Sequence, residues 1–488
     1  MKLIFQKKLL TAFTLLLTGC ISHGASSVSA NQTTHRNILF ILVDDLGWSD
    51  VGCYGSSFYE TPHIDNLAKQ GMRFTDGYAA SPVCSPTRSS ILTGKNPGRT
   101  GNTEYFGGPQ PGPKYNRNTI LQPAPYISRM LLEEKTLAEA LKEQGYATFF
   151  AGKWHLGHSP QFWPENQGFD INKGGHSAGG PYGGKKYFSP YGNPRLSNGP
   201  DGEHLPDRLA SETIQFMETN KDKPFFAYLS FYSVHSPQIS RPDLKKKYDT
   251  KKKPETQWGV EANKKVRLNQ NDAVYAGMVE GMDLAVGRVL SKLTELGLDK
   301  NTVVIFMSDN GGVSTDGAHP TSNLPLRAGK GWIYEGGIRE PLIIKAPGVT
   351  LAGSTCTTPV TSTDFYPTLL ELVGAPLQPQ QHLDGMSIVP LLKGNDTAER
   401  AIYWHYPHYS GGLGGRPSSA IRQGDWKLIE FFEDKHVELY NLRNDIGETS
   451  DLAESQSAKT KELLEKLHAW HKEVGAKLPT PNLKYKGR

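Results

Sequence analysis

The sequence predicts an α/β fold: a large mixed, mostly parallel sheet flanked by helices, with a smaller C-terminal antiparallel sheet plus helix. Two apolar runs, at residues 37–43 and 302–308, are typical of strands that are covered on both faces. Amphipathic segments at 136–145 and 271–296 end at or next to a glycine and predict helices between such strands. This alternation is the pattern of a parallel sheet with helices on its faces.

The N-terminal residues are typical of a targeting segment rather than of the fold. Three lysines precede an apolar stretch at residues 9–17, which is too short to span a bilayer. The segment ends Leu-Thr-Gly-Cys at Cys20 and resembles a bacterial lipobox. We therefore predict a lipoprotein-type signal peptide at 1–19 and a polar tether at 20–36. The protein would be exported to the bacterial periplasm or cell surface and meet the membrane only through lipid on Cys20. An ordinary signal peptide is the alternative.

The composition excludes two classes of protein. The formal net charge of +5 includes the three lysines of the targeting segment, so the mature chain is near neutral and no general nucleic-acid binding is expected. Four cysteines in 488 residues exclude a disulfide-rich scaffold, and Cys53 and Cys356 could be paired or free. Lysines gather between residues 245 and 265, which predicts a solvated insertion loop, with a polyanion-attracting rim as the alternative.

Four predicted strands end in side chains that can bind ions or transfer protons. In open parallel sheets, ligands bind outside the carboxyl ends of the strands, so these side chains are expected to share one site. A single strand end of this kind could be an ordinary turn, because polar residues are common in turns. The occurrence of such residues at the ends of all four strands favours a shared site. The strands at 37–43, 302–308, 146–152 and 224–231 lead respectively into Asp44 and Asp45, Asp309 and Asn310, Lys153 and His155, and His235.

A cysteine stands where a further helix is predicted to begin. Ser85 suits the N-cap, Pro86 suits the first helical position, and Gly94 suits the end of the helix. Cys84 would then face the helix N-terminus, where backbone N–H groups favour an anion, and Arg88 adds a positive charge one turn further on. The segment therefore suits a tetrahedral oxyanion beside a modifiable cysteine. A phosphatase-like loop needs a longer arc between cysteine and arginine, and a buried structural cysteine is the plainer alternative.

Together these motifs resemble the type I sulfatases of the alkaline phosphatase superfamily. The Cys-x-Pro-x-Arg pattern is similar to the maturation motif of that family, in which the cysteine is oxidised to formylglycine, an aldehyde that works as its hydrate. The resemblance runs from about residue 37 to residue 453. It implies catalytic positions at Cys84, Arg88, Lys153, His155, His235 and Lys330, and metal-binding positions at Asp44, Asp45, Cys84, Asp309 and Asn310.

Calcium is the metal that both the residues and the resemblance favour, because aspartate and asparagine offer only oxygen ligands of flexible geometry. On the chemistry that the resemblance implies, the hydrated aldehyde attacks sulfur in line while Arg88 holds its diol. Lys153 and Lys330 clamp the sulfate oxygens, and His235 protonates the leaving oxygen. His155 then takes a proton from the second hydroxyl, which expels sulfate and restores the aldehyde.

The C-terminal part of the chain predicts a small antiparallel sheet closed by a helix. Residues 419–422 and 426–431 form a hairpin pattern across a Gln-Gly-Asp turn. Strand-like segments lie at 401–404 and 438–442, and a helix is expected at about 458–474. The loops at 105–125 and 174–187 combine aromatic and charged residues, which suit a sulfated sugar. The candidate substrate-binding residues are His176, His405, His408 and Arg416.

The sequence thus predicts an exported, calcium-dependent sulfatase that acts on a sulfated carbohydrate, either galactose-type algal polysaccharide or glycosaminoglycan fragments. A formylglycine-generating maturation enzyme is the implied protein partner. Two alternatives stay open: a phosphodiester or phosphonate monoester hydrolase of the same superfamily, and a catalytically dead, glycan-binding surface lipoprotein. The catalytic α/β domain is expected at residues 37–396 and the C-terminal sheet-and-helix subdomain at 397–488.

Overall fold

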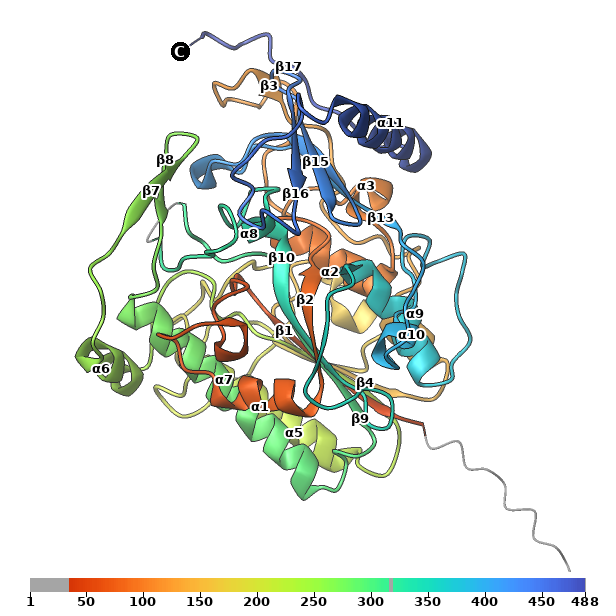
Figure 1. The fold of residues 1–488 in the computed structure, drawn as a ribbon. Helices are drawn as coiled ribbons and strands as arrows, with labels where there is room; N and C mark the ends of the chain where they lie inside the picture. Colours follow the sequence, from red (N-terminus) through yellow and green to blue (C-terminus); the bar gives the residue numbers. More distant parts are fainter. Residues whose placement is uncertain (1–34, 316–318, 488) are drawn as a thin grey trace, which may run out of the picture. The chain divides into compact units, whose positions relative to one another are not determined.

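A mixed sheet crosses the protein, and its central strands run parallel, which confirms the predicted α/β class (Figure 1). The structure is a computed structural model that describes residues 35–315 and 319–487. The predicted signal peptide, Cys20 and almost all of the predicted tether lie outside these residues. The strands, in the order β11-β2-β10-β9-β1-β6-β4-β5 with β12 beside β2, are β1 (Asn37–Val43), β2 (Met72–Tyr78), β4 (Ala147–Gly152), β5 (Ile171–Lys173), β6 (Phe225–Ser230), β9 (Thr302–Ser308), β10 (Arg339–Lys345), β11 (Ser354–Cys356) and β12 (Val360–Thr361).

Helices cover both faces of this sheet. Odd-numbered residues of β1 pack in one hydrophobic cluster with α1, α5 and α7, and even-numbered residues pack in another with α2, α4, α9 and α10 (Figure 1). A strand buried on both faces needs a continuous apolar sequence, which is why residues 37–43 show no polar alternation. The α-helices are α1 (Pro62–Gln70), α2 (Cys84–Thr93), α3 (Pro97–Thr100), α4 (Leu137–Lys142), α5 (Leu205–Thr219), α6 (Pro242–Thr250), α7 (Ala273–Glu295), α8 (Glu335–Ile338), α9 (Phe365–Leu372), α10 (Val389–Leu392) and α11 (Ser457–Val474). Of the helices in the described residues, none combines the length and hydropathy needed to cross a bilayer.

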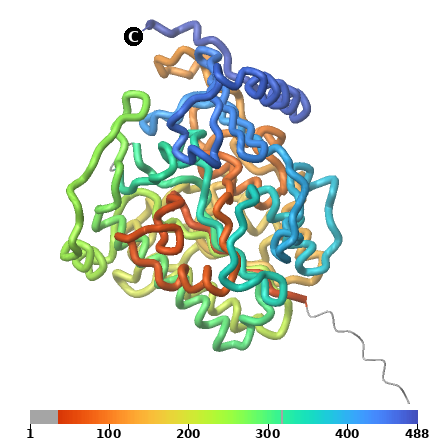
Figure 2. The backbone as a smooth tube through the Cα atoms, viewed as in Figure 1, coloured from red at the N-terminus to blue at the C-terminus, as the bar shows by residue number. Residues whose placement is uncertain are grey.

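The predicted C-terminal sheet forms, and its four strands are antiparallel in chain order. They are β13 (Ala401–Tyr406), β14 (Ser418–Gln423), β15 (Trp426–Phe431) and β16 (Val437–Asn441). One face packs against the segment around α8, and the other against α11. The end of the chain returns to the first third of the sequence, where β17 (Thr480–Pro481) pairs with β3 (Leu121–Gln122), as Figure 2 shows. The predicted boundary at residue 397 stays a prediction, because residues from 35 onward form one compact unit.

Two local predictions were wrong. Helix α2 begins at Cys84 and not after Ser85: its N-cap is Val83, and the Ser85 side chain bonds elsewhere. The lysine-rich segment is a loop only at residues 251–257, since its flanks form α6 and a hairpin of β7 (Trp258–Glu261) with β8 (Lys264–Arg267). The predicted end of α2 is confirmed, because Gly94 adopts the left-handed conformation, with φ of 66°. Cys53, Cys84 and Cys356 are free thiols.

A buried ion network joins the C-terminal sheet to the main sheet and gives a stability prediction. Lys427 on β15 has no exposed side-chain surface and lies 2.9 Å from Glu335 and 2.8 Å from Glu448, which are equally buried. Lys427→Ala would leave both carboxylates without this partner, so we expect the free energy of unfolding to fall by about 3–5 kcal/mol. Urea unfolding followed by fluorescence measures this change.

The control for this prediction is Lys461→Ala on α11, whose side chain is 79 % exposed. That change is expected to alter the free energy of unfolding by less than about 1 kcal/mol. Equal effects of the two substitutions would show that the network does not stabilise the contact between the two sheets.

Candidate active site

The carboxyl ends of four adjacent strands bring the predicted residues together. The strands are β9, β1, β6 and β4, which lie side by side in that order and run parallel. Val43 of β1 is level with Ser308 of β9, so Asp44 and Asp309 leave the sheet at the same height. Gly152 of β4 is level with Ser230 of β6, so the segments that follow these two strands also leave the sheet at the same height. The register of the sheet therefore assembles one site from distant parts of the chain.

Three carboxylates form the acidic centre of this site. Asp44, Asp45 and Asp309 each offer an oxygen, and these oxygens lie within 4.8 Å of one another. All three side chains are buried, and burial raises the pKa of Asp309 to about 6. An oxygen of Asp44 and the side-chain oxygen of Asn310 are buried without a hydrogen-bond partner. Buried acceptors without partners are rare, so this centre is suited to a cation that would bind them.

Two lysines reach the acidic centre. Lys153 Nζ donates to Asp44 Oδ2 at 2.6 Å, and Lys330 Nζ donates to Asp45 Oδ1 at the same distance. Burial by itself would raise the pKa of Asp45, but the positive charges of Lys330 and Lys153 hold that pKa below its ordinary value. Once a metal binds the carboxylates, the positive charges of the two lysines can face an anion.

The first residue of α2 lies beside a histidine. Cys84 Sγ is 3.4 Å from His155 Nδ1, and burial raises the pKa of the thiol. His155 Nε2 lies 3.0 Å from the carbonyl oxygen of Phe106, which can only accept a hydrogen bond. The proton of the neutral imidazole therefore sits on Nε2, and Nδ1 presents a lone pair toward residue 84. Ser85 fixes this arrangement, because its hydroxyl donates to the His155 carbonyl oxygen at 3.0 Å.

Arg88 ties the helix to the acidic centre. Its Nε donates to Asp309 Oδ2 at 2.7 Å, and its Nη1 donates to the carbonyl oxygen of Lys153 at 2.8 Å and to Ser230 Oγ at 2.6 Å. Its Nη2 is buried without a hydrogen bond, 3.8 Å from Asp44 Oδ1. Arg88 therefore fixes a carboxylate and the end of β4 at the same time.

The last predicted histidine lies beside Asp45. His235 Nε2 is 3.8 Å from Asp45 Oδ2, and its Nδ1 bonds the Ser236 carbonyl oxygen at 2.8 Å. Burial and the nearby lysines lower the pKa of His235 to about 3, against the raising effect of Asp45. The ring is thus neutral here, with Nε2 turned toward the site.

The backbone of the site is held in an uncommon conformation at two positions. Asp45 and His155 both have positive φ, of 63° and 56°. Residues other than glycine rarely adopt this left-handed region, and they keep it where the surroundings fix them. Asp45 is fixed by Lys330 and Asn310, and His155 by Ser85. Both are residues that the sequence predicts to be functional.

The candidate substrate residues are not gathered at the site. His405 is buried between Ser419 Oγ and the Lys477 carbonyl oxygen, and His408 is buried against Thr103 Oγ1. Neither ring is presented to a ligand, because His405 packs against β14 and His408 packs against the segment that carries Thr103. His176 is partly buried, and its carbonyl oxygen accepts a hydrogen bond from the His155 backbone. Arg416 is partly exposed and lines a separate cavity, described below.

Several residues that support the site were missed from the sequence. Ser230 joins Arg88 to Lys153, and its position near the end of a predicted strand could have suggested this role. Asn323 bonds the backbone at Gly312 and Ala328 and so fixes the loop that carries Lys330. The sequence offers no signal for Asn323, because its partners are backbone groups brought together only by the fold.

A parallel sheet whose strand ends hold an acidic centre, two lysines and a cysteine at a helix start defines a hydrolase of anionic esters. Residues 36–375 match the model of the sulfatase family, and residues 328–475 match that of the N-sulphoglucosamine sulphohydrolase C-terminal region. The chain belongs to the sulfatase family, within the alkaline phosphatase superfamily, and it is a sulfatase enzyme.

Similar proteins match along nearly the whole chain. A sulfatase of Formosa agariphila is 34 % identical, over 94 % of this chain and 92 % of its own. The N-acetylgalactosamine-6-sulfatase of Canis lupus familiaris is 32 % identical, over 81 % of this chain and 72 % of its own. The crystal structure of Ps i-CgsB in complex with k-i-k-neocarrahexaose is similar with a TM-score of 0.74 at 30 % identity, over 90 % of this chain and 93 % of its own.

Proposed function

We propose that this sulfatase removes sulfate from a sulfated carbohydrate through formylglycine made from Cys84, with calcium bound at the acidic centre. The observation that carries the proposal is the contact of Cys84 Sγ with the unprotonated Nδ1 of His155, beside three clustered carboxylates. A buried thiol whose pKa is raised is a poor nucleophile, so the position calls for a modified side chain. A separate maturation enzyme would supply this modification.

The donor set fits calcium. The metal ligands that Asp44, Asp45, Asp309 and Asn310 can offer are oxygen atoms, and two of these oxygens are buried without partners. Calcium accepts carboxylate and amide oxygens in flexible geometry. Bound there, the metal would offset charge on the sulfate oxygens and favour the ionised form of a hydroxyl on residue 84.

The residues around position 84 can move the proton that the reaction requires. The hydrated aldehyde would supply two hydroxyls, one to attack sulfur and one whose deprotonation lets sulfate leave. His155 Nδ1 lies at 3.4 Å from the Sγ that stands in for this group, and it has a free lone pair. His155 can therefore accept the second proton. An unmodified cysteine or serine would lack the second hydroxyl and would retain the sulfate.

The cations of the site are placed to bind an anion. Lys153 and Lys330 reach the acidic centre from two different segments of the chain, one after β4 and one before α8. Positive groups fixed in a buried site stabilise charge that spreads over sulfate oxygens in the transition state, and they need no rearrangement. Arg88 holds Asp309 and the end of β4, which keeps this geometry in place.

We assign His235 as the general acid for the leaving oxygen. Its Nδ1 is occupied by the Ser236 carbonyl oxygen, so Nε2 is the atom available to the site. The pKa of His235 is low here because of burial and the nearby lysines. An anionic sulfate beside the ring would raise that pKa and favour the protonated form.

His235→Ala is expected to reduce kcat/KM for a sulfated sugar by about 10²–10⁴-fold, the usual contribution of a general acid. An aryl sulfate, whose phenolate leaves without help, should lose less than about tenfold. Sulfate release from both substrates measures the difference. His436→Ala is the matched control, because that ring is 37 % exposed in the C-terminal sheet region. Equal losses on the two substrates would rule out the acid role.

The substrate class is supported by the similar proteins. The similar N-acetylgalactosamine-6-sulfatase, and Ps i-CgsB in complex with a neocarrahexaose, both favour a sulfated polysaccharide or glycosaminoglycan fragment. The lipobox-like N-terminus supports export to the periplasm or cell surface, where such polymers are met. Defined oligosaccharides, each carrying sulfate at one position, would identify the sugar. Faster turnover of phosphodiesters or phosphonate monoesters than of any sugar sulfate would contradict the proposal, and so would a native protein that binds these glycans without releasing sulfate.

A further inference from the structure

A second cavity lies on the side of the protein where the C-terminal sheet meets the β7–β8 hairpin. The volume of this cavity is about 640 Å³. Five separated segments line it: residues 117–120, the tip of the β7–β8 hairpin, the β13–β14 loop at 409–416, residues 433–434, and Tyr485. We call it the loop-409 cavity. A space of this size can hold a small ligand or a short piece of a larger one.

One wall of the loop-409 cavity packs on the segment that carries Lys330. Gly415 packs so closely on the Gly331 carbonyl oxygen that a Cβ at residue 415 would lie 1.7 Å from it. Gly331 follows Lys330, whose amine reaches the acidic centre. Tyr105 lies within electrostatic reach of Arg117 in the cavity wall and of Cys84 in the catalytic centre. A chain-like substrate held at the catalytic centre could therefore extend into this cavity.

Two cations of the cavity have no acidic partner. Arg117 Nη1 donates to the Tyr409 carbonyl oxygen at 3.2 Å, and the methylenes of Lys264 pack beside Gly414. Within residues 35–315 and 319–487, no carboxylate oxygen lies within 4.0 Å of the charged nitrogens of Arg117 or Lys264. Both side chains are partly buried, so their charges are less screened than those of fully exposed side chains.

The acids of the cavity are already engaged. Arg416 Nη1 lies 3.5 Å from Glu433 and 3.6 Å from Asp434, and its guanidinium group lies over the Phe431 ring at 4.6 Å. The Tyr409 hydroxyl also donates to Glu433, at 2.7 Å. Because these acids are held by neighbours, the positive charges of Arg117 and Lys264 are left to face a ligand.

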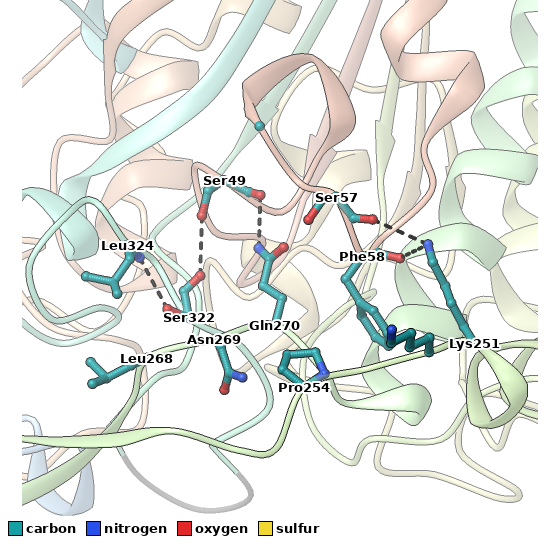
Figure 3. A pocket seen from close by; sticks show the side chains of 12 residues that line it. Ser49, Ser57, Phe58, Lys251, Pro254, Leu268, Asn269, Gln270, Ser322 and Leu324 are labelled. Atoms are coloured by element: carbon teal, nitrogen blue, oxygen red, sulfur yellow. Dashed lines mark hydrogen bonds between the residues drawn. The ribbon is translucent and has the colours of Figure 1, made fainter.

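Another pocket, shown in Figure 3, has a lysine whose charge is engaged by the protein itself. Its Lys251 is turned inward, where Nζ donates to the Phe58 carbonyl oxygen at 2.7 Å and to Glu60 at 2.9 Å. The charge of Lys251 is thus offset within the protein. Lys251 therefore differs from Arg117 and Lys264 of the loop-409 cavity, which have no such carboxylate partner in the part of the chain that the structure describes.

We propose that the loop-409 cavity binds a second anionic group of the glycan that carries the scissile sulfate, through Arg117 and Lys264. The group is a sulfate ester or a carboxylate on a neighbouring sugar, since both present oxygens that arginine and lysine bind with charge-assisted hydrogen bonds. Tyr409 and Tyr485 in the cavity wall suit a sugar ring beside that group. The inference rests on the proposed sulfatase activity toward carbohydrates and selects a substrate with more than one negative charge.

The test compares the double variant Arg117→Gln and Lys264→Gln with the unchanged protein. The substrates are an aryl sulfate, an oligosaccharide with only the scissile sulfate, the same oligosaccharide with a second sulfate, and one with a uronate carboxylate. We expect kcat/KM to fall about 10- to 100-fold for a doubly anionic oligosaccharide, mainly through KM, because two charge-assisted contacts are lost. The other two substrates should change less than about twofold.

The matched control carries Arg443→Gln and Lys461→Gln, which remove the same charges from side chains that are 75 % and 79 % exposed. A loss limited to the disulfated substrate identifies a sulfate ester, and a loss limited to the uronate identifies a carboxylate. Equal losses on singly and doubly anionic oligosaccharides, or no loss on either doubly anionic one, would overturn the inference. Failure of the proposed function would look different, because the unchanged protein would then release sulfate from no sugar.

Discussion

Replacing Cys84 with alanine is expected to abolish sulfate release, with kcat falling by a factor on the order of 10⁴ or more. Alanine cannot be oxidised to an aldehyde, so the site loses its nucleophile while the lysines and the acidic centre stay in place. The loss should be the same for sugar sulfates and aryl sulfates, since both need the nucleophile. Initial rates of sulfate release with saturating substrate measure it.

The matched control is Cys356→Ala, another free cysteine, which lies on the edge strand β11. We expect that variant to keep its activity within about twofold, because its thiol has no place in the chemistry. Thermal unfolding of both variants separates loss of chemistry from loss of fold. Turnover by a folded Cys84→Ala protein at the rate of the unchanged protein would refute the role of residue 84.

The second large effect is expected at the acidic centre. Asp309 is fully buried and accepts a hydrogen bond from Arg88, so Asp309→Ala would leave that guanidinium without a partner and could cost the fold. Asp309→Asn keeps the size and a hydrogen-bond acceptor but removes one negative charge. We expect calcium affinity and sulfate release to fall together by more than about 100-fold. Loss of a residue that only orients a metal ligand typically costs about 10- to 100-fold, and loss of a ligand should cost more.

Calcium content after dialysis, measured by mass spectrometry of the metal, and activity restored by added calcium check this prediction. Asp201→Asn is the matched control, because that side chain is 77 % exposed. An Asp309→Asn protein that retains its calcium but loses activity would assign Asp309 to the chemistry rather than to the metal. Full activity in the presence of a strong chelator would refute the metal site.

The fold and the strand ends could be predicted because their signals are local. Residues 37–43 and 302–308 are continuous apolar runs, and the structure has strands with these same bounds. The acids that follow them meet because parallel strands end at one edge of the sheet. The small C-terminal sheet was also predictable, since a short turn between two alternating segments marks a hairpin.

Other features depend on contacts that no local pattern encodes. Ser85 has the composition of an N-cap, yet its hydroxyl bonds His155, from a segment 70 residues further along the chain. His405 lies in a loop-like aromatic run, but the sheet buries its ring. The lysine-rich stretch folds as α6 and a hairpin because tertiary packing outweighs its weak local preference.

The most direct test is the mass of the peptide that contains residue 84, taken from active protein purified from its own organism. An aldehyde or its hydrate in place of the thiol, in proportion to sulfatase activity, is the result that we predict. Full activity in protein whose residue 84 is entirely an unmodified thiol would contradict it.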